Sequence, residues 1–459
     1  MRNPIITKLA PALLALLATT PAIRADELSD LRQALKALEQ KILVLERKQE
    51  LKDEAATAAA KTTPKITAAD GRVEIASGDG ATSLRLRGLV QADYRWYDAA
   101  NDPVDTFILR RARLIFEGKF NNLFSYVIQS ELAGTVQVLD ANVSAAISPA
   151  FNVRIGKFKT PVGLEQLQSD PLAFFNERSV ATGLTPNRDV GIQIQGEVLD
   201  KRLNYSVALL DGVPDGGNNV TGAADFDSDK TVAARLFAAP FINDRDSFLN
   251  GLGVGFAVST GNYGTAAGRT AGYRTDGQQT FFAYDSTVNA AGKGLTWSPQ
   301  GYFYRGPLGL LAEYVVSSIE LQRGTNPVRE VKNFGYNLSA GYVLTGEDSS
   351  YRGVTPKTVF NPAAGTWGAF ELVGRISGVD VGDSAFTGTA AIRLANPNAS
   401  ATKLTAYGLG LNWYLSRSVR ANFDYFRNEF DLAPGAAPAA NTLIADDETT
   451  FITRFQVSF

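Results

Sequence analysis

Hydrophobic and polar side chains alternate from residue 71 to the C-terminus, and this period of two constrains the fold more than any other feature of the sequence. Successive side chains of a β-strand point to opposite faces, so the pattern predicts strands with one apolar and one polar face. In residues 83–97 the apolar face carries Leu84, Leu86, Gly88, Val90, Ala92, Tyr94 and Trp96, and the polar face carries Arg85, Arg87, Leu89, Gln91, Asp93 and Arg95. The same alternation is expected at 450–459 and at 108–120, where Ile108, Ala112, Leu114, Phe116 and Phe120 oppose Arg111, Arg113, Glu117 and Lys119.

Soluble β-sandwiches also alternate in this way, but two features favour a membrane protein. Arginine recurs on the polar face, and aromatic residues end the apolar face, as they do where a transmembrane strand meets the bilayer interfaces. After the first 25 residues no segment holds the roughly 18 or more apolar residues of a membrane-spanning helix, so the chain would cross with strands. We therefore predict an all-β fold, a transmembrane antiparallel β-barrel over residues 71–459.

The connections between the alternating segments differ in length in a regular way. Short connections are expected at 121–123, 200–202, 306–309 and 416–418, and long ones near 159–188, 211–229, 262–279, 379–402 and 431–447. Turns at one rim and loops at the other are typical of an outer-membrane barrel. The segments add up to roughly 16 strands, which is enough to enclose a water-filled channel.

Residues 1–25 have the pattern of a secretory signal peptide. Arg2 and Lys8 are basic, residues 9–18 form a short apolar core, and cleavage is expected after Ala25, or after Ala22. A membrane-anchor helix is the alternative, but the apolar run is too short for one.

Residues 26–52 carry a heptad repeat that predicts an α-helical coiled-coil segment. Its apolar seam consists of Leu28, Leu31, Leu35, Leu38, Ile42 and Leu45, and its charged flanks include Arg32, Glu39, Lys41, Glu46 and Lys48. Self-association is favoured over packing on another domain, because nothing nearby resembles a helical partner. The low-complexity residues 53–70 are expected to form a flexible linker.

The chain has 459 residues and contains neither histidine nor cysteine. This excludes Ser-His-Asp chemistry, thiol nucleophiles, disulfides and the usual zinc sites. A barrel hydrolase built on acids alone is the enzyme alternative, but no paired-carboxylate motif stands out. We therefore expect no enzyme, no cofactor and no metal, and the net charge of −2 gives no reason to expect nucleic-acid binding.

The alternation places a set of arginines on the face that would line the lumen. They are Arg85, Arg87, Arg95, Arg111, Arg113, Arg154, Arg235, Arg375, Arg420 and Arg454. Arginine keeps its charge and its planar fork matches the oxygens of phosphate or carboxylate, so this set predicts a path for anions. The alternative is that some of them only pair with inward acids, namely Asp93, Glu117, Glu131, Glu197 and Asp424.

Residues 159–188 are too many for a turn and contain two prolines, Pro161 and Pro171. Loops of this length are usually functional, so we expect the segment to fold into the lumen and narrow the pore; an external flap is the alternative. Its candidate constriction residues are Lys159, Glu165, Glu177, Arg178 and Arg188. Arg178 would act at the constriction itself or hold the loop to the wall through Glu177 or Glu165.

Residues 211–229 form an acidic segment with Asp211, Asp215, Asp225, Asp227 and Asp229. The spacing does not match an EF-hand. A solvated external loop, bridged by divalent cations to surface polysaccharide, is favoured over a calcium site.

Several motifs along the chain resemble the phosphate-selective porin O/P family, and their order covers nearly all of 71–459. They are FILRRARL at 107–114, RIGKFKTPVGLE at 154–165, NERS at 176–179, NRDVG at 187–191, LTGE at 344–347, GLNWY at 410–414 and RFQVSF at 454–459. The terminal Phe459 resembles the signal read by the barrel assembly machinery of the outer membrane.

The resemblance implies a homotrimer of sixteen-stranded porins in the outer membrane of a Gram-negative bacterium, with the coiled coil in the periplasm and lipopolysaccharide around the barrel. It implies an inward third loop, a ladder of arginines and constriction lysines that hold phosphate. Arg111, Arg113 and Lys159 match that pattern, whereas a full set of lysines does not. The expected function is passive diffusion of small anions such as phosphate; a general small-solute porin and a structural barrel that tethers the envelope are the alternatives.

Overall fold

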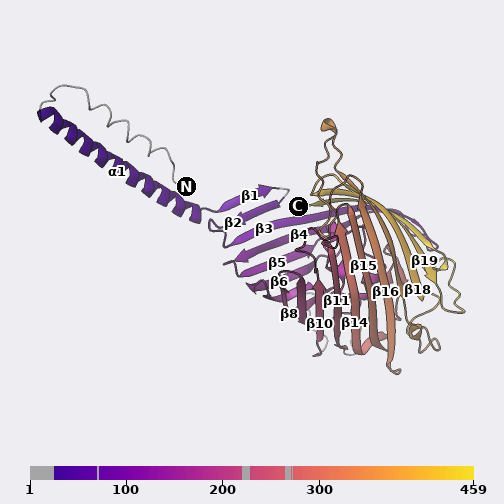
Figure 1. Cartoon of the computed structure of the whole chain (residues 1–459). Helices are drawn as coiled ribbons and strands as arrows, with labels where there is room; N and C mark the ends of the chain where they lie inside the picture. Colours follow the sequence, from indigo (N-terminus) through magenta and orange to yellow (C-terminus); the bar gives the residue numbers. More distant parts are fainter. Residues whose placement is uncertain (1–24, 70–71, 220–227, 264–269, 271) are drawn as a thin grey trace. The chain divides into compact units, whose positions relative to one another are not determined.

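The structure, a computed structural model, describes residues 25–69, 72–219, 228–263, 270 and 272–459 (Figure 1). They divide into two compact units, one with the residues up to Pro64 and Ser77–Asp79, the other with Lys65–Ala76 and Gly80–Phe459. The expected signal peptide lies outside the described residues except for Ala25, so it stays a prediction.

The first unit contains one long helix, α1 (Ala25–Thr62). The seam leucines and isoleucine from Leu31 to Leu45 are between 48% and 64% exposed. Among the described residues, no helix combines the length and the hydrophobicity that crossing a bilayer requires.

The flexible linker expected at 53–70 is not what the structure contains. α1 continues to Thr62, and two strands follow as an antiparallel hairpin, β1 (Lys65–Ala69) and β2 (Arg72–Ala76). Alanine is the strongest helix former, so the alanine-rich run after Glu54 prolongs the helix, and the β-branched Ile66 and Thr67 favour a strand.

The second unit is a closed antiparallel β-barrel. Consecutive strands pair around the ring, and β20 pairs with β3 to close it. The main sheet has 18 strands, of which β1 and β2 lie outside the ring, so the barrel has sixteen, as the sequence predicts. These are β3 (Ser83–Asp98), β4 (Thr106–Phe120), β5 (Phe124–Glu131), β6 (Gln137–Ser148), β7 (Phe151–Lys159), β8 (Arg188–Val198), β9 (Leu203–Leu210), β10 (Thr231–Ala238), β11 (Leu252–Tyr263), β14 (Val288–Arg305), β15 (Leu308–Arg323), β16 (Arg329–Val343), β17 (Ala369–Asp380), β18 (Lys403–Tyr414), β19 (Val419–Asp431) and β20 (Glu448–Ser458).

The remaining elements are short and lie in the connections between barrel strands. They are α2 (Leu164–Leu167), η2 (Asp170–Leu172), η3 (Val180–Leu184), β12 (Tyr273–Arg274), β13 (Thr280–Phe282), η4 (Pro362–Ala364), η5 (Asp383–Ala385) and η6 (Leu443–Ala445).

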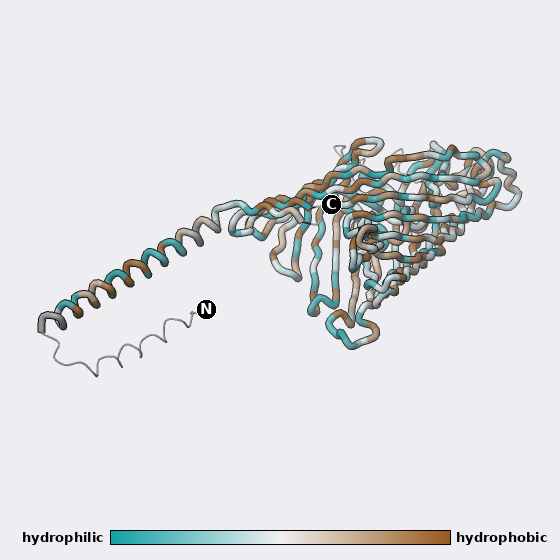
Figure 2. Tube along the Cα trace, turned by 90° about the horizontal axis from the view of Figure 1, so that it is seen from above, coloured by the Kyte–Doolittle hydropathy of each residue, from teal (hydrophilic) through white to brown (hydrophobic). Residues whose placement is uncertain are grey.

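Hydrophilic and hydrophobic residues alternate along strands of the barrel wall (Figure 2). On β3, Leu84, Val90 and Trp96 are exposed on the outer face, whereas Gln91 and Arg95 are buried on the lumen face. Exposed apolar side chains on a wall that closes on itself suit contact with lipid.

A β-bulge in β4 shifts this alternation. Gln91 of β3 pairs with Arg111 and the next residue, Ala92, pairs with Leu109, so Arg110 has no partner. Beyond the bulge Ile108 pairs with the buried Asp93 and shares its lumen face. The prediction that Ile108 lies on the outer face is therefore wrong, because a period of two does not register the extra residue of a bulge.

The two rims of the barrel differ in their connections. We name the rim with the turns at 121–123, 149–150, 199–202, 306–307 and 415–418 the turn rim, and the opposite one the loop rim. The expected contrast in length is incomplete, because the turn rim also carries the longer connections 239–251 and 344–368, and the loop rim carries the short connections 132–136 and 324–328.

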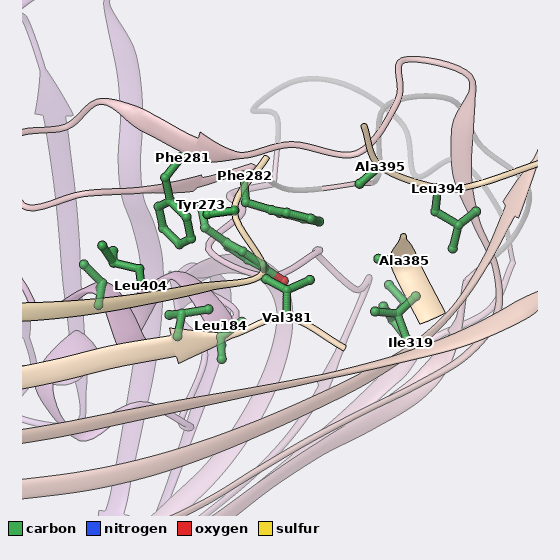
Figure 3. Close-up of a cluster of buried hydrophobic side chains, with 14 of the residues drawn as sticks. Leu184, Tyr273, Phe281, Phe282, Ile319, Val381, Ala385, Leu394, Ala395 and Leu404 are labelled. Carbon is green, nitrogen blue, oxygen red and sulfur yellow. The ribbon is translucent and has the colours of Figure 1, made fainter. Parts of the chain in front are cut away.

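A hydrophobic cluster lies inside the barrel against the inner face of β14–β18 (Figure 3). Val315, Ile319 and Leu404 contribute from the wall. Leu184, Phe281, Phe282, Val381, Ala385, Leu394, Ala395, Leu443 and Ile444 contribute from loop-rim connections. These connections therefore fold inward as a packed body of side chains, as a hydrophobic core requires.

Candidate functional site

The connection between β7 and β8, residues 160–187, crosses the interior of the barrel; we name it the lumen loop. Near its start, the backbone N–H of Leu164 donates to Oε1 of Glu313 on β15 at 2.7 Å. Near its middle, the N–H of Asn176 donates to Oδ2 of Asp424 on β19 at 2.6 Å. These wall partners lie on the strands opposite β7 and β8, which does not fit an external flap.

Glu177 is the main anchor of the lumen loop, and we name it and its three arginines the anchor cluster. Its carboxylate lies 2.8 Å from Nη2 of Arg95, 2.7 Å from Nε of Arg110 and 3.0 Å from Nη2 of Arg454, and its side chain is 3% exposed. Burial alone would raise the pKa of Glu177, but the surrounding guanidinium charges outweigh it and hold that pKa well below its usual range. Glu177 is therefore a permanent anion that neutralises part of the arginine array.

Two further arginines hold the lumen loop by its backbone. Nη1 of Arg375 on β17 donates to the carbonyl of Glu177 at 2.9 Å, and its guanidinium lies 4.5 Å from the centre of the Phe175 ring. Arg420 on β19 donates to the carbonyls of Ala173 and Phe174 at 2.8 and 3.0 Å. These guanidiniums are occupied by the loop rather than presented to an open channel.

Asp170, in η2 of the lumen loop, is the centre of a second charged group, the Asp170 cluster. Its carboxylate contacts Arg113 of β4 directly and lies 2.6 Å from Nη1 of Arg178. Arg111 is farther away, with Nη2 at 3.4 Å. Burial would raise the pKa of Asp170, but the charges of Arg111, Arg178 and Arg113 hold it well below its usual range.

A cavity of about 860 Å³ lies between the lumen loop and the walls of β3–β10. Its basic lining residues are Arg72, Arg87, Arg113, Arg154, Lys159, Arg188, Arg235, Arg352 and Arg417, and its acidic ones are Glu117, Asp140 and Asp170. Nine cations against three carboxylates make this a positively charged chamber, and low-dielectric walls strengthen the field inside it.

The model of the family "Phosphate-selective porin O and P" matches residues 84–459, which is most of the chain and includes every barrel strand except the first residue of β3. The chain belongs to this porin family. It is an outer-membrane β-barrel porin, and the family points to a channel rather than an enzyme.

Individual relatives agree with this assignment. The porin is 25% identical to Porin O of Pseudomonas aeruginosa over 425 residues, which cover 85% of this chain and 91% of the relative. Among solved structures it is similar to OmpT of Vibrio cholerae (TM-score 0.51, 12% identity, 86% of this chain and 100% of that one). It is also similar to the outer membrane channel DcaP of Acinetobacter baumannii (0.50, 11%, 83% and 98%) and to an anion-selective porin from Comamonas acidovorans (0.50, 14%, 82% and 100%). At these identities the structures show the fold alone.

The structure separates the candidate pore residues of the porin into three groups. Those that line the cavity are Arg87, Arg113, Arg154, Lys159, Arg188 and Arg235. Those that are buried against the lumen loop are Arg95, Arg111, Arg375, Arg420 and Arg454. Arg85 lies towards the turn rim with its side chain 41% exposed, paired with Glu74 at 2.8 Å and Glu117 at 3.2 Å. The alternation in the sequence could not distinguish these groups. It shows on which face of a strand a residue lies, but not which other residues cover that face.

Glu165 and Arg178 both stabilise the lumen loop from within. Glu165 accepts hydrogen bonds from the N–H and the hydroxyl of Ser179 at 3.0 and 2.5 Å. Arg178 donates to Asp170 and to the backbone carbonyls of Glu165 and Gln168. A bond from Arg178 to the carboxylate of Glu177 or Glu165, which was one of the two roles considered for it, is not among these bonds, because its guanidinium pairs with Asp170 instead.

Two residues important to these clusters were not singled out from the sequence. Arg110 reaches Glu177 only because of the bulge, which no residue pattern announces. Asp170 directly precedes Pro171 in the loop, and this acid beside a proline was the available signal.

The acidic segment 211–229 is only partly described, since Asp225 and Asp227 lie outside the described residues. Asp215 is not a solvated loop residue: it accepts hydrogen bonds from the hydroxyls of Tyr273 at 2.9 Å and Ser317 at 2.8 Å. No group of three or more acids in the described part of the chain is arranged to hold a metal ion.

Phe459 completes the wall at the turn rim. Its N–H donates to the carbonyl of Gly88 at 3.0 Å, and its own carbonyl accepts from the N–H of Gly88 at 2.8 Å. The Phe459 ring occupies the space where a side chain of residue 88 would lie, so Gly88 is required for this close approach.

Proposed function

We propose that the porin conducts small anions by passive diffusion, with phosphate and related oxyanions as the preferred class. The observation that carries this proposal is the charge of the lumen cavity, where nine basic residues face three acids. Side-chain charges along a pore select ions by sign without trapping them. The guanidinium fork also matches the oxygens of phosphate in geometry.

The cavity-lining group is the part of the arginine array that we assign to the anion path. Arg154 supports this assignment, since it lines the cavity, its Nε donates to the hydroxyl of Ser144 at 3.3 Å, and no carboxylate among the described residues lies within salt-bridge distance of it. Lys159 belongs to the same group, because it lines the cavity and its Nζ donates to the carbonyls of Gln166 and Gln168 at 2.7 and 3.0 Å. The arginines of the anchor cluster are assigned to holding the lumen loop that narrows the pore.

The test is the reversal potential of the purified porin in planar bilayers across a potassium chloride gradient. Anion preference is expected, and cation preference would overturn the proposal. Phosphate added during chloride conduction should then reduce the current. A pore that prefers anions but is not blocked by millimolar phosphate is the general small-solute porin, and a barrel without conductance is the structural alternative.

We also propose that the porin is a homotrimer, with α1 as a coiled coil in the periplasm. β1 and β2 lead into the start of β3, which lies at the turn rim, and the exposed seam of α1 suits helical partners. Deleting residues 26–52 should leave trimers on native electrophoresis, because the barrel walls carry most of the contact. If the deletion gave monomers instead, α1 would provide the main contact of the trimer.

Two further partners belong to the same proposal. Phe459 serves as the recognition signal for the barrel assembly machinery, and lipopolysaccharide contacts the barrel in the outer membrane. Replacing Phe459 with alanine should reduce the amount of folded porin in the outer membrane, whereas unchanged levels would contradict the assembly role.

A further inference from the structure

Three hydroxyl side chains form a row across the inner face of β11, β14 and β15, and we name them the hydroxyl row. Ser259 pairs with Thr296, and Thr296 pairs with Ser317, so the three side chains are neighbours on the lumen face. They are 4%, 8% and 2% exposed. The hydroxyls of Ser259 and Thr296 form no hydrogen bond with any other residue that the structure describes. Buried polar groups normally have a partner, so these two hydroxyls point to a further ligand.

A small cavity of about 10 Å³ lies against the hydroxyl row. Val213, Pro214 and Asp215, from the connection that follows β9, cover the row and line this cavity together with it. One carboxylate and three hydroxyls therefore border the same space, which has room for one particle the size of a water molecule. Asp215 remains partly exposed, which leaves a route to the cavity from solvent.

The carboxylate of Asp215 has no basic counterpart in the described part of the chain. Its oxygens accept hydrogen bonds from the hydroxyls of Ser317 at 2.8 Å and Tyr273 at 2.9 Å, and both of these donors are uncharged. A buried carboxylate without a counter-charge is costly, and either a proton or a bound cation relieves that cost. The oxygen atoms around the cavity are the ligands that hard cations prefer.

The number of ligands favours a cation with a single charge. Calcium takes six to eight oxygens and magnesium keeps several waters, and a cavity for one water-sized particle has no room for such a shell. One carboxylate also balances one positive charge. A sodium ion is close to a water molecule in size, so it suits this space.

We propose that this cavity is a binding site for a small monovalent cation such as sodium, with the Asp215 carboxylate and the hydroxyl row as its ligands. The site is separate from the anion path, because none of its lining residues lines the cavity of about 860 Å³. A bound ion fastens the connection after β9 to the wall at β11, β14 and β15. Through the bond from Tyr273 to Asp215 it also stabilises the hydrophobic cluster, to which Tyr273 belongs.

The experiment measures the melting temperature of the folded porin in detergent, in the chlorides of sodium, potassium and choline at equal ionic strength. The pH is 7.5, above the pKa of about 6 that burial gives Asp215, so that the carboxylate is ionised. In sodium we expect a melting temperature about 2 °C higher than in choline, because a ligand that binds only the folded state stabilises it. The larger potassium ion should have a smaller effect than sodium.

Three variants locate the effect. Asp215→Asn should abolish the difference between sodium and choline. Thr296→Val, which keeps the shape and charge of the residue but removes one ligand, should raise the sodium concentration for half of the effect by about tenfold. Asp285→Asn is the matched control and should keep the full sodium effect, because Asp285 also lies in a loop-rim connection but pairs with Arg323 at 2.7 Å and does not line the cavity.

Two results would overturn the inference. Equal melting temperatures of the wild type in the three salts would mean that the cavity holds water only, and this comparison needs no variant. A sodium effect of the same size in Asp215→Asn would place the ion elsewhere. If Thr296→Val does not fold, Ser259→Ala removes another hydroxyl of the row and is read in the same way.

Discussion

Arg110 and Arg111 are adjacent in the sequence, yet both side chains point into the lumen, because β4 bulges opposite Gln91 and Ala92. Nε of Arg110 donates to Glu177 at 2.7 Å, and Nη1 of Arg111 donates to Gln91 at 2.7 Å. A regular strand would send one of them into the lipid. The bulge thus raises the density of positive charge where the lumen loop meets the wall.

Replacing Glu177 with glutamine should release the lumen loop. Three arginines would lose their shared carboxylate in a buried site, and breaking a buried ion pair costs about 3–5 kcal/mol. Limited trypsin digestion of the folded porin checks this, with cleavage at Arg178 expected in the variant and protection in the wild type. Glu74→Gln is the control, since its pair with Arg85 is partly exposed to solvent and such a pair is worth about 1 kcal/mol or less. A trypsin-resistant Glu177→Gln variant would show that the backbone contacts alone hold the loop.

Replacing Arg154 with glutamine should weaken anion selectivity more than replacing Arg85. Arg154 lines the cavity and has no salt bridge within the described part of the chain, whereas Arg85 is paired with Glu74 and Glu117. The reversal potential in a salt gradient measures the difference, with a shift towards zero for Arg154→Gln and little change for Arg85→Gln. Equal shifts would mean that the net charge of the barrel, not the cavity lining, selects the ions.

Gly88 and Phe459 should show a strong energetic coupling. A Cβ at position 88 would lie 2.2 Å from Cζ of Phe459, so Gly88→Ala should destabilise the folded porin by about 1–3 kcal/mol through overpacking. In a Phe459→Ala background the clash is gone, and the same change at Gly88 should cost much less. Urea unfolding of the two single variants and the double variant in lipid vesicles gives the coupling. If the destabilising effects of the two single variants simply added in the double variant, the Phe459 ring would not lie against residue 88.

Asp215 should give the porin a pH-dependent stability. Burial raises the pKa of Asp215 to about 6, although hydrogen bonds from Ser317 and Tyr273 act in the opposite direction. The fold therefore favours the protonated acid, and this contribution is complete below its ordinary value of 3.8 and lost as the pH rises through about 6.

Melting temperatures measured from pH 4 to pH 7 test this sign. The wild type should lose stability relative to Asp215→Asn as the pH rises, because the asparagine stays neutral. Asp102→Asn, a change at an exposed loop-rim residue, should leave the wild-type slope unchanged. If the melting temperature of the wild type rose relative to that of Asp215→Asn with increasing pH, the fold would stabilise Asp215 as an anion instead.

The barrel could be predicted from sequence because its determinants are local. Alternation fixes which side chains face lipid, and the turn clusters fix where strands end, so the number of strands followed directly. The linker prediction failed for an equally local reason. A low-complexity segment is usually taken as flexible, but this one is rich in alanine, which extends the helix. The long turn-rim connection at 344–368 was missed, because its content of Gly, Pro and Ser does not indicate at which rim of the barrel a connection lies.

The charged clusters depend on contacts between residues far apart in the chain. Arg454 meets Glu177 only because β20 closes on β3 and the lumen loop crosses beneath them. Sequence patterns identified the arginines but could not assign Asp170 or Glu177 as their counterions, since any of several inward acids was eligible. Which charges remain available to a permeating ion is thus a property of the tertiary structure.

The hydrophobic cluster fills part of the lumen beside β14–β18, whereas the charged cavity lies beside β3–β10, and no residue belongs to both. The width of the open space in the lumen therefore depends on these inward-folded connections as well as on the number of strands. Substitutions in the inward-folded connections could widen or narrow it while the surrounding wall stayed the same.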